Sequence, residues 1–170
     1  LGLALANSLG VLGGALHIAT HAVGKITLFM CAGSIYVATH RTNVSELDGL
    51  GRIMPITFGA FLVGAVSIVG LPPFGGSWSK WLLVLGAIEA DQILIVAAFM
   101  ISSLLNVAYL LPIISRAFFS PSIQNNSNNG LGMHEAPLLC WAPTVFTAIS
   151  CLILFFYSGY VNDFLIPITN

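Results

Sequence analysis

The stretch Gly70-Leu71-Pro72-Pro73-Phe74-Gly75-Gly76, GLPPFGG in one-letter code, decides how this sequence folds. It interrupts a region that is otherwise mostly apolar from residue 54 to residue 88. Such a run cannot continue an α-helix, because proline lacks a backbone donor and glycine weakens helices. In a bilayer the break is tolerated where protein or a water-filled cavity solvates the free backbone groups. The sequence therefore predicts a broken membrane helix, with its break at Gly70, Pro72, Pro73, Gly75 and Gly76.

The composition of the 170 residues supports a membrane location. Hydrophobic residues make up 57% of the chain and charged residues 6%, whereas soluble domains carry about 25% charged residues. Several apolar stretches reach the roughly 20 residues that a helix needs to cross a bilayer. We expect an all-α, polytopic transmembrane helix bundle whose surroundings are lipid. The net charge of −1 gives no basic patch for nucleic acid, so no nucleic-acid partner is predicted.

Residues 1–170 are expected to form a single membrane domain with about four spans. The predicted spans are residues 11–38, 54–88 with the break at 70–76, 93–119 and 138–157. Residues 120–137 are rich in Ser, Asn and Gly, and are predicted to form a flexible loop. The sequence starts at Leu1 without the features of a signal peptide, so we expect the chain to continue upstream.

The arginines indicate how the spans are oriented. Residues 77–88, after the break, would reach only about 18 Å as a helix, which is too short to cross alone. With one broken crossing, all three arginines fall on the same side, and the opposite side carries acidic residues such as Glu89 and Asp163. The positive-inside rule then places loops 39–53 and 120–137 in the cytoplasm. We expect a multi-pass protein of the cell inner membrane, with Arg41, Arg52 and Arg116 facing the cytoplasm.

Four ionisable residues are predicted at membrane depth. His17, His21 and Lys25 are spaced by four residues, so they form a row about 12 Å long on one helix face. Lys80 lies just beyond the predicted break. Ionisable side chains inside a membrane span are costly and mark ion or proton paths. The alternative interpretations are lysines that reach toward an interface and histidines that only bond neighbouring helices.

Polar residues near these groups are candidates for lining such a path. Ser79 precedes Lys80, and Ser102 and Asn106 lie on the third span in a polar stripe with Ser103 and Tyr109. Hydrogen bonding between helices is the alternative role for this stripe. The two histidines also have the spacing of a metal-binding or haem-bearing helix, but the other candidate ligands lie in loops or are scattered in apolar segments. We therefore predict no metal site and no cofactor.

The order of these motifs resembles a known family. The segment HIATHAVGKITLF, residues 17–29, is similar to the His-x-x-x-His-x-x-x-Lys helix of the antiporter-like subunits shared by respiratory complex I and Mrp-type cation/proton antiporters. SELDGLGRIMPITFGAF, residues 45–61, and GLPPFGGSWSKW, residues 70–81, resemble the loop and discontinuous helix that follow there. HEAP, residues 134–137, is similar to the start of the next helix. The resemblance covers nearly the whole chain.

The resemblance implies a fourteen-helix type of subunit with two inverted five-helix repeats, each containing a broken helix. This chain would be a C-terminal fragment that holds most of the second repeat. In that family the lysines matched by Lys25 and Lys80 belong to a central axis that relays protons, and His17 and His21 match its supporting histidines. The carboxylate and lysine of the first repeat are absent from this sequence.

Three functional hypotheses follow from the residues and the resemblance. The first is a proton-translocating subunit of a multisubunit monovalent cation/proton antiporter, similar to the D subunit of the Mrp type because of the double proline and Ser79-Lys80-Trp81. Its partners would be other membrane subunits, protons and Na⁺. The second is a proton-pumping subunit of NADH:quinone oxidoreductase or a membrane-bound hydrogenase. The third is a scaffold that conducts nothing. In each case the chain is not expected to be a catalyst in itself.

Overall fold

The computed structural model describes residues 2–121 and 135–169, and this part of the chain is helical without β-strands. Three helices are long and apolar enough to cross a membrane, and a fourth is apolar but shorter. These observations confirm an all-α fold and a multi-pass membrane protein. The α-helices are α1 (Ser8–Thr39), α2 (Pro55–Val69), α3 (Gly76–Glu89), α4 (Ile93–Phe119), α5 (Leu138–Phe156) and α6 (Ser158–Thr169). Short 3-10 helices are η1 (Leu3–Leu5), η2 (Val44–Glu46) and η3 (Leu50–Arg52).

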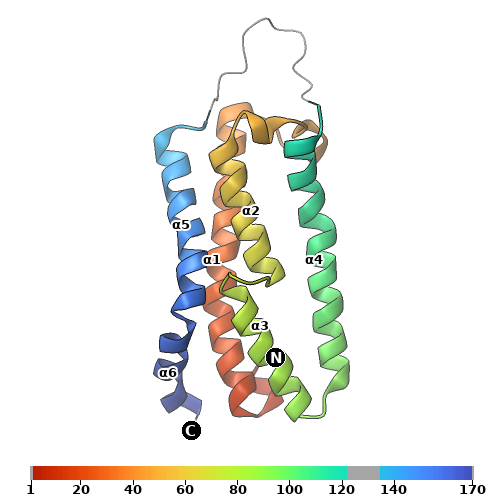
Figure 1. Cartoon of the computed structure of the whole chain (residues 1–170), viewed down its shortest axis with the longest axis vertical. Helices are drawn as coiled ribbons and strands as arrows, with labels where there is room; N and C mark the ends of the chain where they lie inside the picture. Colours follow the sequence, from red (N-terminus) through yellow and green to blue (C-terminus); the bar gives the residue numbers. More distant parts are fainter. Residues whose placement is uncertain (1, 122–134, 170) are drawn as a thin grey trace, which may run out of the picture.

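Helices α2 and α3 lie end to end and together cover the length that α1 covers alone (Figure 1). Helix α1 packs against α2, α3 and α5. Helix α4 lies on the other side of α2 and α3, and it is largely exposed along its length. The arrangement is therefore a helix bundle in which the column formed by α2 and α3 is broken near its middle.

The break between α2 and α3 is produced by glycine at two positions. Gly70 has φ of +88°, a left-handed conformation that residues with a side chain seldom adopt. Its N–H and that of Leu71 both donate to the Val66 carbonyl, at 2.9 and 3.2 Å, and so end α2. At the other side of the break, a Cβ on Gly76 would lie 2.0 Å from the carbonyl oxygen of Ser67. Glycine at this position lets the start of α3 touch the end of α2.

Glycines also bring α3 close to α1. A Cβ on Gly13 would lie 2.8 Å from the Leu83 nitrogen, and one on Gly86 would lie 2.7 Å from the Gly10 nitrogen. Asn7, the N-cap residue at the start of α1, adds hydrogen bonds to the same contact. Its side chain accepts from Gly10 N–H at 2.8 Å and donates to the Gly86 carbonyl at 2.7 Å. This close packing places the first turns of α1 against the last turns of α3.

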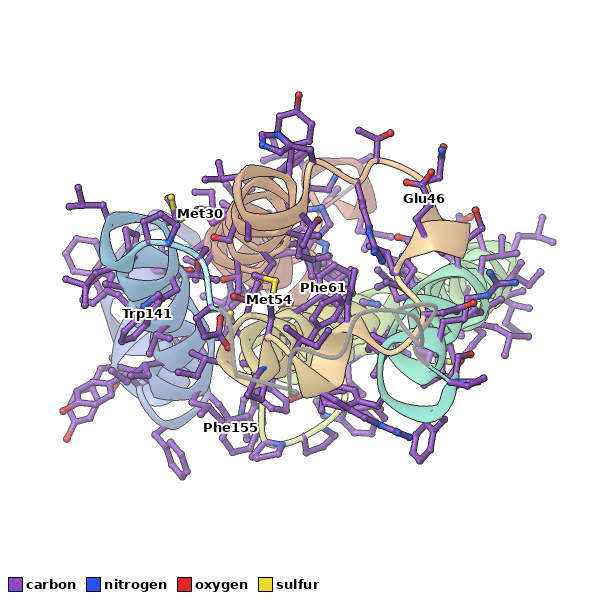
Figure 2. All side chains as sticks on the ribbon, turned by 90° about the horizontal axis from the view of Figure 1, so that it is seen from above. Met30, Glu46, Met54, Phe61, Trp141 and Phe155 are labelled. Carbon is purple, nitrogen blue, oxygen red and sulfur yellow. The ribbon has the colours of Figure 1, made fainter. Side chains whose placement is uncertain are left out.

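The loop between α1 and α2 is fastened to the last turn of α4. Gly49 N–H donates to the Arg116 carbonyl at 3.2 Å, and the Arg52 side chain donates to the Phe118 carbonyl at 2.9 Å. An apolar cluster lies below the loop and joins it to α1, α2, α4 and the residues before α5. In the end-on view, Met54 of this cluster lies in the middle of the bundle near Phe61 of α2 (Figure 2). Its buried members are Ile35, Leu47, Leu50, Met54, Phe58, Ala117 and Ala136.

The C-terminal part of the chain extends beyond the predicted spans. The last span is predicted to end at residue 157, but the structure continues with helix α6, which contacts α1. Asp163 therefore lies on an exposed face of a helix rather than in a loop. The predicted flexible loop 120–137 falls mostly on residues 122–134, which lie outside the described residues.

Candidate functional site

Lys80 lies beside the break between α2 and α3 and bonds the end of α2. It lies on the second turn of α3 and is half-buried. Its Nζ donates to the Val69 carbonyl at 2.8 Å and to Ser103 Oγ of α4 at 2.9 Å. Val69 is the last residue of α2, where helix carbonyls lack partners and the helix dipole is negative. A cation at this position is stabilised by the helix end, so Lys80 connects α2, α3 and α4 at the break.

Gly70 makes room for the lysine. A Cβ at this position would lie 2.7 Å from Lys80 Cδ. The glycine thus has two functions, because it adopts the left-handed conformation that ends α2 and it leaves space for the aliphatic part of Lys80. The break in the helix and the position of the lysine are linked through this one residue.

Ser79 connects α3 to the histidine row of α1. Its side chain is fully buried. Its Oγ donates to the Gly76 carbonyl at 3.1 Å and lies 3.0 Å from His17 Nδ1. Thr20 Oγ1 also donates to Ser79 Oγ, at 3.2 Å. Because Ser79 Oγ donates its one hydrogen to Gly76, its lone pairs can accept a hydrogen bond from His17 in the tautomer that carries its hydrogen on Nδ1.

The histidine row continues along α1. The rings of His17 and His21 are stacked, with their centroids 5.2 Å apart and an angle of 29° between the rings. Lys25, one turn further, is exposed. None of the hydrogen bonds among the described residues involves Lys25. The structure therefore brings together Ser79, His17 and His21 beside Lys80, and it leaves Lys25 on an outer face of α1.

The polar stripe of α4 has one member that contacts the site. Ser103 bonds Lys80, whereas Ser102 is exposed and Asn106 accepts from Tyr109 on its own helix at 2.7 Å. Thr20 is absent from the residues predicted from the sequence, and Ser103 is predicted only as a member of the polar stripe, with Ser102 and Asn106 preferred as path-lining residues. Thr20 lies three residues after His17, so helical spacing could have identified it. Ser103 could not be chosen over Ser102 without the rotation of α4.

A cavity of about 680 Å³ opens beside Lys80, between the break, α3 and α4. Ser77, Lys80 and Ser103 are among the residues that line it, and its wall is mainly apolar. The largest apolar members of the wall are Trp78, Trp81, Phe99, Met100 and Phe155. A half-buried amine at such a cavity has few partners for its charge, so its interaction with Val69 and Ser103 determines how it is held.

Carboxylates lie away from these basic groups. Glu89 accepts from Asn7 at the end of α3, and Glu135 accepts from the first turn of α2. No salt bridge forms among residues 2–121 and 135–169, so Lys25 and Lys80 have no carboxylate partner there. In the same part of the chain, no three His, Cys, Asp or Glu side chains converge to hold a metal ion. The groups that the site offers are imidazole, hydroxyl and amine groups, which can donate and accept hydrogen bonds.

Comparison with known proteins gives the context of this site. Residues 1–106 match the family described as NADH:quinone oxidoreductase/Mrp antiporter, TM. The chain is 43% identical over 118 residues to NADH-quinone oxidoreductase subunit N of Desulforudis audaxviator, which covers 69% of this chain and 24% of that protein. It is 28% identical over 166 residues to the D subunit of the Na⁺/H⁺ antiporter of Alkalihalophilus pseudofirmus, which covers 96% of this chain and 34% of that protein.

The fold is also found in a solved structure. A chain of respiratory complex I from Thermus thermophilus with bound aureothin matches with a TM-score of 0.68 and 22% identity, over 92% of this chain and 36% of that chain. At this identity the likeness shows the fold alone. The chain spans only a quarter to a third of the length of the two curated relatives above. Because the family match covers more than half of its residues, the chain belongs to the NADH:quinone oxidoreductase/Mrp antiporter family of membrane proteins.

Proposed function

We propose that this chain relays protons within the membrane, along a path that joins Lys25, His21 and His17 of α1 to Lys80 of α3. The observation that carries the proposal is the contact of His17 Nδ1 with Ser79 Oγ at 3.0 Å, one residue from Lys80. Imidazole can take a proton on one nitrogen and release one from the other, and a hydroxyl can both accept and donate. The half-buried lysine at the break is the end of this path.

The surroundings of the two lysines favour a proton relay rather than a fixed ion pair. A carboxylate close to a buried lysine stabilises its protonated form, and its departure favours loss of the proton. The described residues place no carboxylate at Lys25 or Lys80. We infer that this counter-charge comes from another segment or subunit of a larger membrane complex. Protons, and Na⁺ in an exchanger, are the ions proposed.

Two assemblies are candidates for this relay. The first is a multisubunit monovalent cation/proton antiporter in which this chain is the D-type subunit, supported by the match to such a subunit over 96% of the chain. The second is an NADH:quinone oxidoreductase, supported by 43% identity to its subunit N. Purification of the native complex separates them: flavin and iron–sulfur absorbance with the chain indicates the oxidoreductase, and their absence with sodium-dependent proton exchange indicates the antiporter.

The relay itself can be tested in proteoliposomes that contain the purified native complex. We expect Lys25→Ala and Lys80→Ala each to lower proton uptake by at least about tenfold, because each removes an essential ionisable group. Arg116→Gln is the control, since Arg116 is an exposed cation on α4 outside the path. Wild-type uptake in both lysine variants would exclude the relay and favour the scaffold hypothesis.

A further inference from the structure

Glu135 binds the first turn of α2 from a distant part of the sequence. Its Oε1 accepts from the Ile56 N–H at 2.7 Å, and its Oε2 accepts from Thr57 Oγ1 at 2.7 Å. Thr57 is fully buried, and Ala136, next to the glutamate, is packed in the apolar cluster around Met54. Both carboxylate oxygens are therefore engaged, and the backbone that carries them is held in place.

Helix α2 has no local side chain that could replace this contact. Its N-cap residue, Met54, makes no side-chain cap hydrogen bond, and Pro55 at the first helical position has no N–H. The N–H of Ile56 is one of the donors that a helix start leaves without a partner. An anion at a helix N-terminus is stabilised by both the free N–H groups and the helix dipole. Glu135 supplies that anion.

The opposite end of α2 carries the complementary charge. There the Val69 carbonyl accepts from Lys80 at 2.8 Å. The half-helix is thus held between a carboxylate at its first turn and an amine at its last residue. Helix α2 is only 15 residues long, so a shift or rotation of α2 at Glu135 also moves the carbonyl that holds Lys80.

We propose that Glu135 is a positioning residue for Lys80: it fixes α2 so that the Val69 carbonyl stays within hydrogen-bonding distance of the lysine amine. This inference rests on the proposed proton relay. Glu135 does not touch Lys80 and takes no proton itself. Its contribution is to set how firmly Lys80 holds a proton, since a displaced Val69 leaves the amine with one acceptor fewer. His17 and His21 of α1 are the other titratable groups near Lys80. Their contacts are with Ser79 and with each other.

The test uses the native complex with Glu135→Gln, which keeps the size of the side chain and removes its charge, and Glu135→Asp, which keeps the charge. Hydrogen exchange of the α2 amides is measured alongside proton flux as a function of pH. In Glu135→Gln we expect exchange of the amides at residues 56–58 to accelerate about tenfold, the size expected for a weakened charge-assisted hydrogen bond. The proton concentration for half-maximal flux should rise severalfold. Glu135→Asp should restore part of both effects.

Glu46→Gln is the matched control, because Glu46 is a carboxylate in the loop between α1 and α2 whose hydrogen bonds are to Asn43 and Thr42 of its own loop. It should leave both measurements at the wild-type values. Unchanged α2 exchange in Glu135→Gln would overturn the cap. Faster exchange with an unchanged half-maximal proton concentration would show a local cap without any effect on Lys80, and would overturn the positioning role. If the wild-type complex carries no proton flux, the relay fails, and hydrogen exchange still reports on the cap.

Discussion

At the scale of single residues, Ser79 is the connection between two helices that carry ionisable groups. It is fully buried, it contacts His17 and Thr20 of α1, and it precedes Lys80. Few side chains could replace it, because the site requires a small group that both donates and accepts a hydrogen bond. In the proposed relay, this hydroxyl is therefore the group that connects α1 to α3.

Replacement of this hydroxyl tests the connection. Ser79→Ala leaves His17 Nδ1 without its partner, at a cost of about 1–3 kcal/mol for an unpaired buried group, whereas Thr20 Oγ1 keeps the Leu16 carbonyl as its acceptor. We expect a lower unfolding temperature and proton flux reduced by about tenfold or more in the native complex. Ser150→Ala is the control, because Ser150 Oγ of α5 is outside the site and bonds only the Phe146 carbonyl, at 2.9 Å, among the described residues. Equal flux in the two variants would show that Ser79 has only a packing role.

Lys25 offers a second test at this scale. It is exposed and bonds no described residue, so Lys25→Ala should leave assembly intact while it abolishes coupled transport. Lys25→Arg should also fail, because guanidinium keeps its proton even when it is desolvated. Proton flux and the yield of assembled complex are measured for both variants. Wild-type flux in Lys25→Arg would identify Lys25 as a fixed charge and contradict its role in the relay.

Sequence alone could select the ionisable residues but not their contacts. His17, His21, Lys25 and Lys80 stand out because charge in an apolar helix is rare. The partner of Lys80 on α4 could not be chosen, because Ser102 and Ser103 differ by only about 100° around the helix. The rotation of α4, set by packing, turns Ser103 toward the lysine. The Val69 carbonyl has no sequence signal at all, since every residue has one.

At the scale of elements, the break depends on how closely α3 approaches α2. Gly76→Ala would place a Cβ 2.0 Å from the Ser67 carbonyl, which is backbone and cannot move aside cheaply. We expect a destabilisation of about 1–3 kcal/mol, the usual cost of overpacking, or more. Gly59→Ala is the control, because no heavy atom lies within 4 Å of the position that its Cβ would occupy on α2. Thermal unfolding of the two variants in detergent should differ by several degrees, and equal stability would contradict this account of the break.

Composition and helix breakers are the signals from which a sequence can locate helices and their ends. Apolar length defines α1, α4 and α5, and the GLPPFGG segment locates the break within a residue of its observed limits. Helix α6 was missed because Gly159, Asn162 and Asp163 give its sequence the polarity of a span end. Its contacts with α1 stabilise a helix there despite that composition. Packing against another element is information that a local pattern does not contain.

At the scale of the whole molecule, the three arginines lie at the end of the bundle opposite to Glu89 and Asp91, although Glu46, Asp48 and Glu135 share the arginine end. The loop with Arg41 and Arg52, the end of α4 with Arg116 and the start of α5 lie at one end (Figure 1). The junction of α3 with α4, which holds Glu89 and Asp91, lies at the opposite end. One broken crossing produces this separation, and we expect the arginine end to face the cytoplasm by the positive-inside rule.

Cysteine labelling from one side of the membrane tests that orientation. Single cysteines at Ser45 and Ser120 represent the arginine end, and one at Ala90 represents the opposite end. Cys140 is replaced by alanine in this background, whereas Cys31 and Cys151 are buried and react slowly. In inside-out vesicles, an impermeant maleimide should label Ser45→Cys and Ser120→Cys but not Ala90→Cys.

The reverse labelling in right-side-out cells is the control for access. There the Ala90→Cys variant should react and the other two should stay unmodified, since the label cannot cross the bilayer. If Ala90→Cys instead reacts from the same side as Ser45→Cys, α2 and α3 enter and leave through one face of the membrane. The relay from Lys25 to Lys80 would then have to return to the face it started from, and the broken crossing could not carry protons across.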